Sequence, residues 1–142
     1  PRLRQRYMHT EKRRVVLDTN IVISAFISQF GAAAQIFEMF LEGNIINYTS
    51  EEILQEAEEV IHRLEFTEYI ADKKFMIDNL RKLSLIINVT SNEMIVREDP
   101  ADDKIVNCAL DAGADIVSWD NHLLKLKKFR NVKIISPKEF LL

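Results

Sequence analysis

The sequence contains few of the residues that mark specialised classes of protein. Its 142 residues include one cysteine, Cys108, so no disulfide can form within the chain, and this favours a reducing compartment. No apolar run approaches the roughly 20 residues needed to cross a bilayer, and the N-terminus lacks the charged-then-apolar pattern of a signal peptide. We therefore expect a cytoplasmic protein without membrane association.

Charge is unevenly distributed, although the net charge is only −3. The charged residues of segments 1–14 and 118–142 are mostly basic, whereas EEILQEAEE at 51–59 contains five glutamates. Basic ends around an acidic middle can hold a nucleic-acid backbone beside a metal site, but plain solvation explains the same pattern. We expect residues 1–13 to form a basic arm, either disordered or extraneous to the natural chain.

Apolar periodicity predicts alternating strands and helices. The predicted strands are 13–19, 44–50, 84–90, 114–120 and 132–136. The predicted helices are 20–27, 32–43, 51–64, 72–83, 99–113 and 121–129, followed by a closing turn. Alternation of this kind is typical of a parallel sheet covered by helices on both faces. The expected fold is therefore one α/β domain, residues 14–142, with about five parallel strands; Phe26, Phe37 and Phe40 are assigned to its core rather than to a partner contact.

Two aspartates interrupt apolar segments where predicted strands end. Asp18 follows VVL and precedes TNIVISAF, and Asp120 follows DIVSW. An unpaired buried carboxylate costs several kcal/mol or loses its charge, so each needs compensation. Each could simply cap the following helix. Ligands of parallel α/β sheets bind at the carboxyl ends of the strands, however, and two such acids favour a shared site there.

A third acid begins the helix predicted over 99–113. Asp102 lies on the same helical face as the apolar stripe, whereas Asp103 points about 100° away, toward solvent. A competing interpretation has Asp99 as N-cap and Pro100 at the first helical position, with Asp102 complementing the helix dipole. The two roles are compatible, and periodicity favours Asp102 over Asp103 as a site residue.

The glutamate-rich helix after Ser50 offers a fourth acid, but spacing does not identify it. Ser50 is the predicted N-cap. Glu56 and Glu58 border opposite edges of the apolar stripe at nearly equal angles, whereas the remaining glutamates face solvent. The choice between Glu56 and Glu58 stays open on periodicity alone.

Several carboxylates in one cleft require a cation or raised pKa values. Two unit charges 4 Å apart repel by about 4 kcal/mol at an effective dielectric constant of 20. Oxygen ligands without a His or Cys set at metal spacing indicate a hard ion such as Mg²⁺ or Mn²⁺. Ions bound in this way serve phosphoryl chemistry by activating water and neutralising charge on phosphate.

Four segments match a known family in order and spacing: VVLDTNIVISAF, TSEEILQEAEEVI, EDPADDKIVNCALDAGAD and IVSWDNHLL. They cover nearly all of residues 14–140 and resemble the PIN-domain nucleases, in particular the VapC-like branch of toxins in toxin–antitoxin pairs. The resemblance implies an endoribonuclease that uses one or two Mg²⁺ or Mn²⁺ ions to hydrolyse RNA. It also implies an antitoxin partner and a homodimer.

The resemblance assigns roles to individual residues, and it selects Glu56 over Glu58. The implied catalytic residues are Asp18, Glu56, Asp102 and Asp120, of which the three aspartates bind metal. Asn20 and Ser118 match supporting polar positions, whose amide and hydroxyl groups are suited to orienting carboxylates or the attacking water.

Two residues depart from the family pattern beside the last acid. Trp119 replaces a small or basic residue and is suited either to packing under the last helix, which we expect, or to stacking on a base. His122 replaces a second acid; it is expected to be a surface histidine, with phosphate donation or metal binding as alternatives.

Two rival functions remain. A haloacid-dehalogenase-type phosphatase also ends its first strand in Asp, but it needs a second acid where this chain has Asn20. A catalytically silent PIN-like module that binds RNA or a partner is the other alternative.

Overall fold

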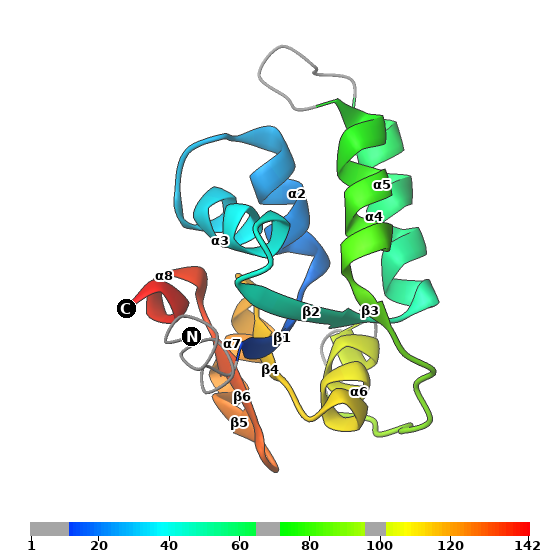
Figure 1. Ribbon diagram of the computed structural model, residues 1–142. Helices are drawn as coiled ribbons and strands as arrows, with labels where there is room; N and C mark the ends of the chain where they lie inside the picture. Colours follow the sequence, from blue (N-terminus) through cyan, green and yellow to red (C-terminus); the bar gives the residue numbers. More distant parts are fainter. Residues whose placement is uncertain (1–11, 65–71, 96–101) are drawn as a thin grey trace, which may run out of the picture.

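The computed structural model describes residues 12–64, 72–95 and 102–142, and these form a sheet between two layers of helices. The strands are β1 (Arg13–Leu17), β2 (Ile45–Thr49), β3 (Leu85–Ile86), β4 (Asp115–Val117), β5 (Lys128–Phe129) and β6 (Val132–Ile135). The helices are α2 (Thr19–Ile27), α3 (Ala32–Leu41), α4 (Glu51–Arg63), α5 (Lys73–Leu83), α6 (Asp103–Ala112), α7 (Asn121–Leu126) and α8 (Pro137–Leu141). Figure 1 shows α2 to α5 above the sheet and α6 and α7 below it.

The sheet has the strand order β3-β2-β1-β4-β6-β5, with β1 near its centre. The first five strands in that order are parallel, as predicted, and β5 adds an antiparallel edge to β6. In this register Leu17 pairs with Val117. Because β1 and β4 are parallel neighbours, the residues that follow them, Asp18 and Ser118, emerge side by side at one edge of the sheet.

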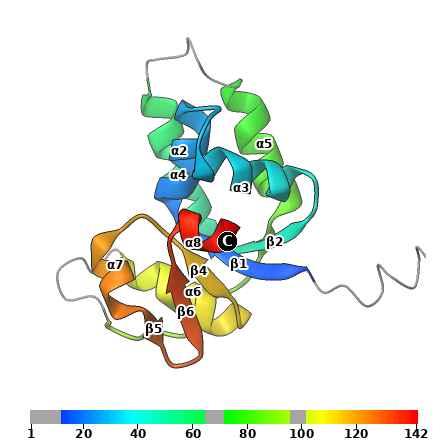
Figure 2. The same ribbon diagram turned by 90° about the vertical axis from the view of Figure 1, so that its left-hand side faces the viewer.

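Each face of the sheet has its own hydrophobic core, because side chains alternate along a strand. Val15 and Leu17 of β1 pack with α2 to α5 and α8, whereas Val16 between them packs with α6 and α7. Seen edge-on in Figure 2, the two helical layers lie on opposite sides of β1 and β4. The core role predicted for three phenylalanines is confirmed, since each is at most 4% exposed: Phe26, Phe37 and Phe40. Burying a side chain of this size contributes roughly 2–3 kcal/mol.

Local signals position several helix ends where the sequence predicts them. The Oγ of Ser50 accepts a hydrogen bond from Ile53 N at 3.2 Å and caps α4. Gly113 ends α6 with φ of 63°, a conformation that glycine adopts without steric cost. The expected arm 1–13 falls mainly on residues outside the described ranges. Arg13 itself is the first residue of β1, and its guanidinium donates to the Phe140 carbonyl at 2.9 Å.

Four predicted elements differ in the structure, one of them the strand expected over 114–120, which is confined to Asp115–Val117. The helix expected over 121–129 ends at Leu126, because Lys127 and Arg130 adopt φ of 59° and 54° and turn the chain into the β5–β6 hairpin. The strand expected over 84–90 is confined to Leu85–Ile86. The predicted closing turn is helix α8, which Ser136 caps and Pro137 begins.

No single helix in the described ranges is long and apolar enough to cross a membrane. Helices α2 and α3 reach that length and apolarity only together, and a bend of 99° separates them. Their apolar residues pack in the core described above.

Candidate metal centre

Asp18 is buried at the end of β1, and its carboxylate does not cap α2. It is 6% exposed and occupies the N-cap position without a side-chain capping bond. Its Oδ2 accepts a hydrogen bond from Ser118 Oγ at 2.7 Å, and its backbone N–H donates to Val117 at 3.0 Å. The sheet therefore directs Asp18 toward the end of the neighbouring strand, and the capping interpretation does not describe its side chain.

Burial raises the pKa of Asp18 to about 6. Hydrogen bonds from Ser118 and the Thr19 backbone lower this pKa in part, whereas the charges of Asp120 and Glu56 raise it further. The carboxylate is thus held where its negative charge is unfavourable. A bound cation would reverse that balance.

Asp120 lies next to Asp18 through a shared partner, Ser118. The Ser118 hydroxyl, which is fully buried, donates to Asp18 and accepts from the backbone N–H of Asp120 at 2.9 Å. Asp120 does cap its helix, since its Oδ1 accepts from His122 N at 2.8 Å. Asp120 can therefore cap α7 and also belong to the site, because a carboxylate can accept more hydrogen bonds than this one.

Asn20, the second residue of α2, links that helix to the loop after β4. Its Oδ1 accepts a hydrogen bond from Trp119 N at 3.3 Å. Ser118 and Asn20 therefore both hold the loop after β4 against the start of α2. These contacts are what a supporting role requires.

Asp102 reaches the same edge from α6, on the other face of the sheet. It immediately precedes the helix and is 9% exposed. The following residue, Asp103, faces elsewhere, as predicted, but it is half-buried rather than solvated, since it accepts a hydrogen bond from Ile95 N at 3.0 Å. Asp99 and Pro100, the alternative cap, lie outside the described residues.

The two candidate glutamates, Glu56 and Glu58, lie on different sides of α4. Glu56 lines a cavity with the three aspartates, whereas Glu58 faces α5 and forms an ion pair with Arg81. Geometry therefore distinguishes the two residues that periodicity could not. The Glu56 carboxylate also pairs with Lys104 of α6 at 2.6 Å, a contact that helical periodicity does not predict.

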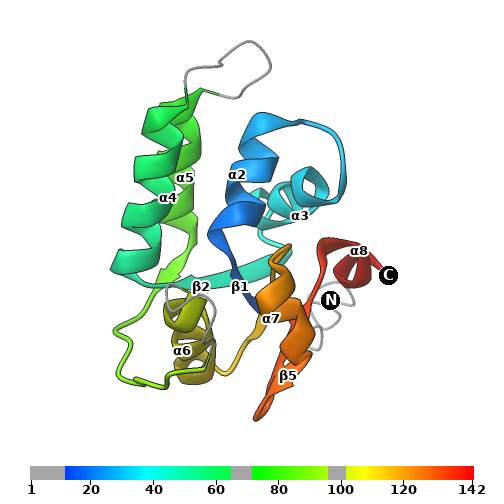
Figure 3. The same ribbon diagram turned by 180° about the vertical axis from the view of Figure 1, so that it is seen from behind.

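The cavity bounded by these acids has a volume of about 370 Å³. Its acidic side is formed by Asp18, Glu56, Asp102 and Asp120, and α2 and α4 add an apolar wall of Ile23, Ile27 and Val60. Figure 3 shows the elements that supply the acids, α2, α4, α6 and α7, converging from both layers on this edge of the sheet. Four acids separated by up to about a hundred positions in the sequence thus share one cavity.

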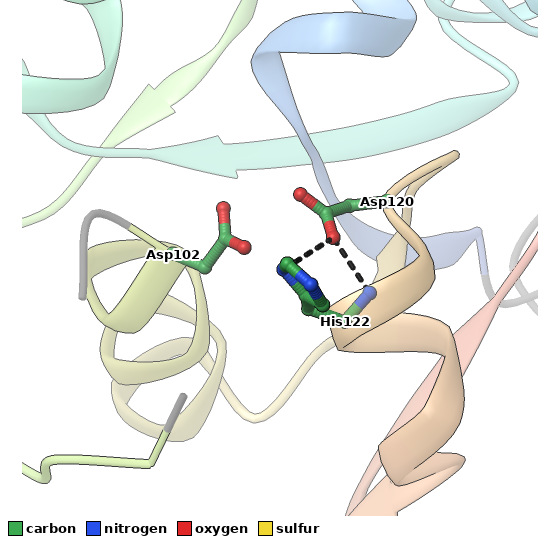
Figure 4. Close-up of side chains that lie close together, drawn as sticks. All are labelled: Asp102, Asp120 and His122. Atoms are coloured by element: carbon green, nitrogen blue, oxygen red, sulfur yellow. Dashed lines mark hydrogen bonds and ion pairs between the residues drawn. The ribbon is translucent and has the colours of Figure 1, made fainter. Parts of the chain in front are cut away.

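Within the described residues, one group has ligand atoms close enough for a single metal ion: Asp102, Asp120 and His122, mutually within 4.8 Å. Figure 4 shows Asp102 facing the Asp120–His122 pair across a narrow gap. Ligands that share one cation at about 2.1 Å lie roughly 3–4.2 Å apart, so small side-chain rotations complete the set. This donor set fits a divalent cation. Asp18 lines the same cavity but does not belong to this group.

A larger cavity, of about 500 Å³, lies between α4, α6 and residues 87–94. It also contains carboxylates, but two of them are in ion pairs with arginines, Glu51 with Arg81 and Glu93 with Arg130. Its charge is therefore partly neutralised by protein groups. The smaller cavity also has one ion-paired acid, Glu56, but it is lined by Asp102 and Asp120, whose ligand atoms lie at metal spacing, so it is the better candidate for a metal.

Trp119 differs from its expected placement. Its side chain is 43% exposed, so the expectation that it packs beneath the last helix is wrong. Its backbone N–H donates to Asn20, which lines the cavity, so the backbone of residue 119 lies beside the rim. His122 and Lys104 are the other two residues whose placement at the site the sequence did not favour.

Three comparisons place the chain among known proteins. The sequence model of the family described as PIN domain matches residues 14–122. The Uncharacterized protein MJ1680 of Methanocaldococcus jannaschii is 32% identical over 145 residues, which cover 94% of this chain and 93% of that protein. A chain in the crystal structure of VapBC2 from Rickettsia felis, bound to a DNA fragment from their promoter, has a TM-score of 0.58 at 16% identity and covers 87% of this chain and 98% of its own. The structural likeness establishes the fold, and the sequence matches establish that the chain belongs to the PIN domain family.

Proposed function

We propose that this protein is a divalent-metal-dependent endoribonuclease of the VapC-like toxin type. The observation that carries the proposal is the convergence of four carboxylates on one cavity, where one buried aspartate has its pKa raised to about 6. Carboxylates gathered against their mutual repulsion favour a site that binds a hard cation. PIN nucleases generally use such ions, and the chain belongs to that family.

The acids divide the work of the proposed reaction. Asp18, Asp102 and Asp120 would hold Mg²⁺ or Mn²⁺, directly or through water. The ion, when bound, would lower the pKa of a water molecule and neutralise charge on the scissile phosphate. Glu56 would accept a hydrogen bond from the attacking water and orient it in line with the phosphodiester. Ser118 would fix the orientation of Asp18, and Asn20 would hold the loop that carries Asp120, through the bonds described above.

Basic residues and an exposed aromatic suit an RNA substrate. The C-terminal region 118–142 carries six lysines or arginines, which would contact backbone phosphates without reading sequence. The exposed Trp119 at the rim would stack on a base. An RNA strand would therefore cross the loop after β4 with its phosphate over the acids.

A protein antitoxin and a second copy of the chain are the proposed partners. The structural neighbour is a VapBC complex with promoter DNA, which supports an antitoxin by analogy. The apolar wall beside the acids suits a partner segment that combines apolar and basic side chains. A toxin of this kind would act in the cytoplasm.

The test is cleavage of total cellular RNA with and without Mn²⁺, followed by mapping of the new ends. The variant Asp120→Asn should lose metal-dependent cleavage while it retains the fold, as judged by circular dichroism. Glu58→Gln is the matched control, since Glu58 lies on the same helix as Glu56 but faces Arg81. Undiminished cleavage by Asp120→Asn would contradict the proposal.

A catalytically silent binding module is the second candidate, and the Lys104–Glu56 ion pair favours it. If the lysine keeps Glu56 occupied, the water-orienting group is lost while the RNA-binding surface remains. Metal and RNA binding without any cleavage would support this alternative.

A further inference from the structure

His122 lies beside two acids of the cavity, Asp102 and Asp120, although its side chain does not line the cavity itself. It is the second residue of α7, and its side chain is 41% exposed. An isolated surface histidine would point into solvent. This imidazole instead lies beside Asp120 and faces Asp102, and these two acids precede different helices, α7 and α6 (Figure 4).

The distance between His122 and Asp120 is unsuited to a hydrogen bond and suited to shared ligation. The imidazole Nδ1 lies 3.9 Å from Asp120 Oδ1, too far for a hydrogen bond between them. Two ligands that share one cation at about 2.1 Å lie roughly 3–4.2 Å apart. The same Oδ1 is held at 2.8 Å by the backbone N–H of His122. That bond fixes the carboxylate and the imidazole relative to each other at the start of α7.

The chemistry of the donor set distinguishes this site from one built of oxygen alone. Mg²⁺ prefers oxygen ligands and retains several waters, whereas first-row transition ions accept imidazole nitrogen more readily than Mg²⁺ does, even Mn²⁺, which binds nitrogen most weakly among them. We propose that His122 is a direct metal ligand, which completes an Asp102–Asp120–His122 centre and makes it selective for Mn²⁺ over Mg²⁺. This inference rests on the proposed function only in placing a divalent ion at these acids.

The test uses Mn²⁺ as both ligand and spectroscopic probe, with the full-length chain. Electron spin-echo envelope modulation of bound Mn²⁺ should show coupling to the ¹⁴N of an imidazole. The coupling should disappear in His122→Asn and in His122→Asp. His62→Asn is the matched control, because His62 is an exposed histidine in the last turn of α4, and it should leave the signal unchanged.

Affinities measured by calorimetry give a second readout. His122→Asn should weaken Mn²⁺ binding by about tenfold or more. His122→Asp restores an oxygen ligand, so it should lower the ratio of Mn²⁺ to Mg²⁺ affinity by about tenfold. Because His122 is partly exposed, we expect both variants to fold, and their thermal unfolding should match that of the parent chain.

The outcomes separate this inference from the proposed nuclease function. Bound Mn²⁺ without ¹⁴N coupling, together with unchanged affinities in both variants, would overturn the role of His122 and leave the nuclease proposal standing. Coupling in a chain that cleaves no RNA would support the ligand and overturn the nuclease. Failure of Mn²⁺ to bind at all would overturn both.

Discussion

Helix α4 has acidic residues on two sides, and the two groups are in opposite electrostatic situations. On the side facing α5, the Arg81 guanidinium donates to Glu51 at 2.7 and 3.0 Å and also contacts Glu58. These contacts raise the pKa of Arg81 and lower that of Glu51. On the side facing the sheet edge, Glu56 pairs with Lys104, but burial raises the pKa of Asp18 to about 6, and the charges of Asp120 and Glu56 add to that rise.

The difference separates carboxylates that stabilise the fold from those that act against it. Ion pairs between α4 and α5 favour the folded state modestly. Acids gathered in one cavity lower stability at neutral pH, and such arrangements are typical of functional sites. Substitutions in the two groups should therefore have opposite effects, and the following predictions test that contrast.

The largest expected effect is on RNA cleavage, and it should distinguish two adjacent acids, Asp102 and Asp103. Asp102 lines the acidic cavity, whereas Asp103 accepts a hydrogen bond from Ile95. Asp102→Asn should reduce Mn²⁺-dependent RNA cleavage by more than about a hundredfold, because it removes a proposed metal ligand. Asp103→Asn keeps an oxygen acceptor for Ile95 and should retain most of the activity. Equal initial rates for the two variants would contradict the assignment.

The next largest effect is on stability: replacing the buried Asp18 should stabilise the protein rather than destabilise it. Because the pKa of Asp18 is raised in the folded state, the folded chain binds the proton more tightly than the unfolded chain. This group's contribution to the free energy of unfolding therefore falls as pH rises from about 4 to about 6 and is constant above that. Without metal, Asp18→Asn should stabilise the protein by about 1–3 kcal/mol at pH 8 and by little at pH 4. Urea unfolding at both pH values measures this, and destabilisation at pH 8 would contradict it.

Removing the ion pairs between α4 and α5 should lower stability, by less than the gain expected at Asp18. Arg81→Met should lower the free energy of unfolding by about 1 kcal/mol, since its pairs with Glu51 and Glu58 are partly exposed. Urea unfolding at low and high salt is the measurement. The loss should shrink at high salt, and a stability gain would show that the paired side resembles the acidic cavity after all.

The smallest effect concerns Lys104, which pairs with Glu56 at 2.6 Å. Lys104→Met removes a positive charge close to the proposed cation, so Mn²⁺ affinity should rise by about threefold to tenfold. Lys74→Met is the control, because Lys74 forms a similar pair with Asp78 on α5. Weaker Mn²⁺ binding by Lys104→Met in calorimetry would mean that the lysine supports the site rather than opposing the ion.

Sequence signals with local causes predicted much of the fold. The caps at Ser50 and Gly113 and the alternation of strands and helices depend on neighbouring residues, and the structure confirms them. The approach of Asp18 and Asp120 also followed from strand ends, because parallel neighbours end at one edge. The β5–β6 hairpin was missed because it depends on Lys127 and Arg130 in left-handed conformations, which no local residue type signals.

The side-chain contacts at the site depend on how the helices pack against one another, and the periodicity of a single helix does not predict that packing. Glu56 and Glu58 are equivalent on a helical wheel, and only the position of α5 separates them. Lys104 and His122 reach acids of the cavity from α6 and α7 through tertiary packing, Lys104 at Glu56 and His122 beside Asp102 and Asp120. The family resemblance named the acids, whereas these two residues are particular to this three-dimensional arrangement.

The most direct test of the account is anomalous diffraction from crystals grown with MnCl₂. We expect one dominant anomalous peak within coordination distance of the carboxylates of Asp102 and Asp120, inside the smaller cavity. A peak confined to the larger cavity beside Glu51 and Glu93, or no peak at saturating Mn²⁺, would contradict the claim that these acids gather to bind a metal.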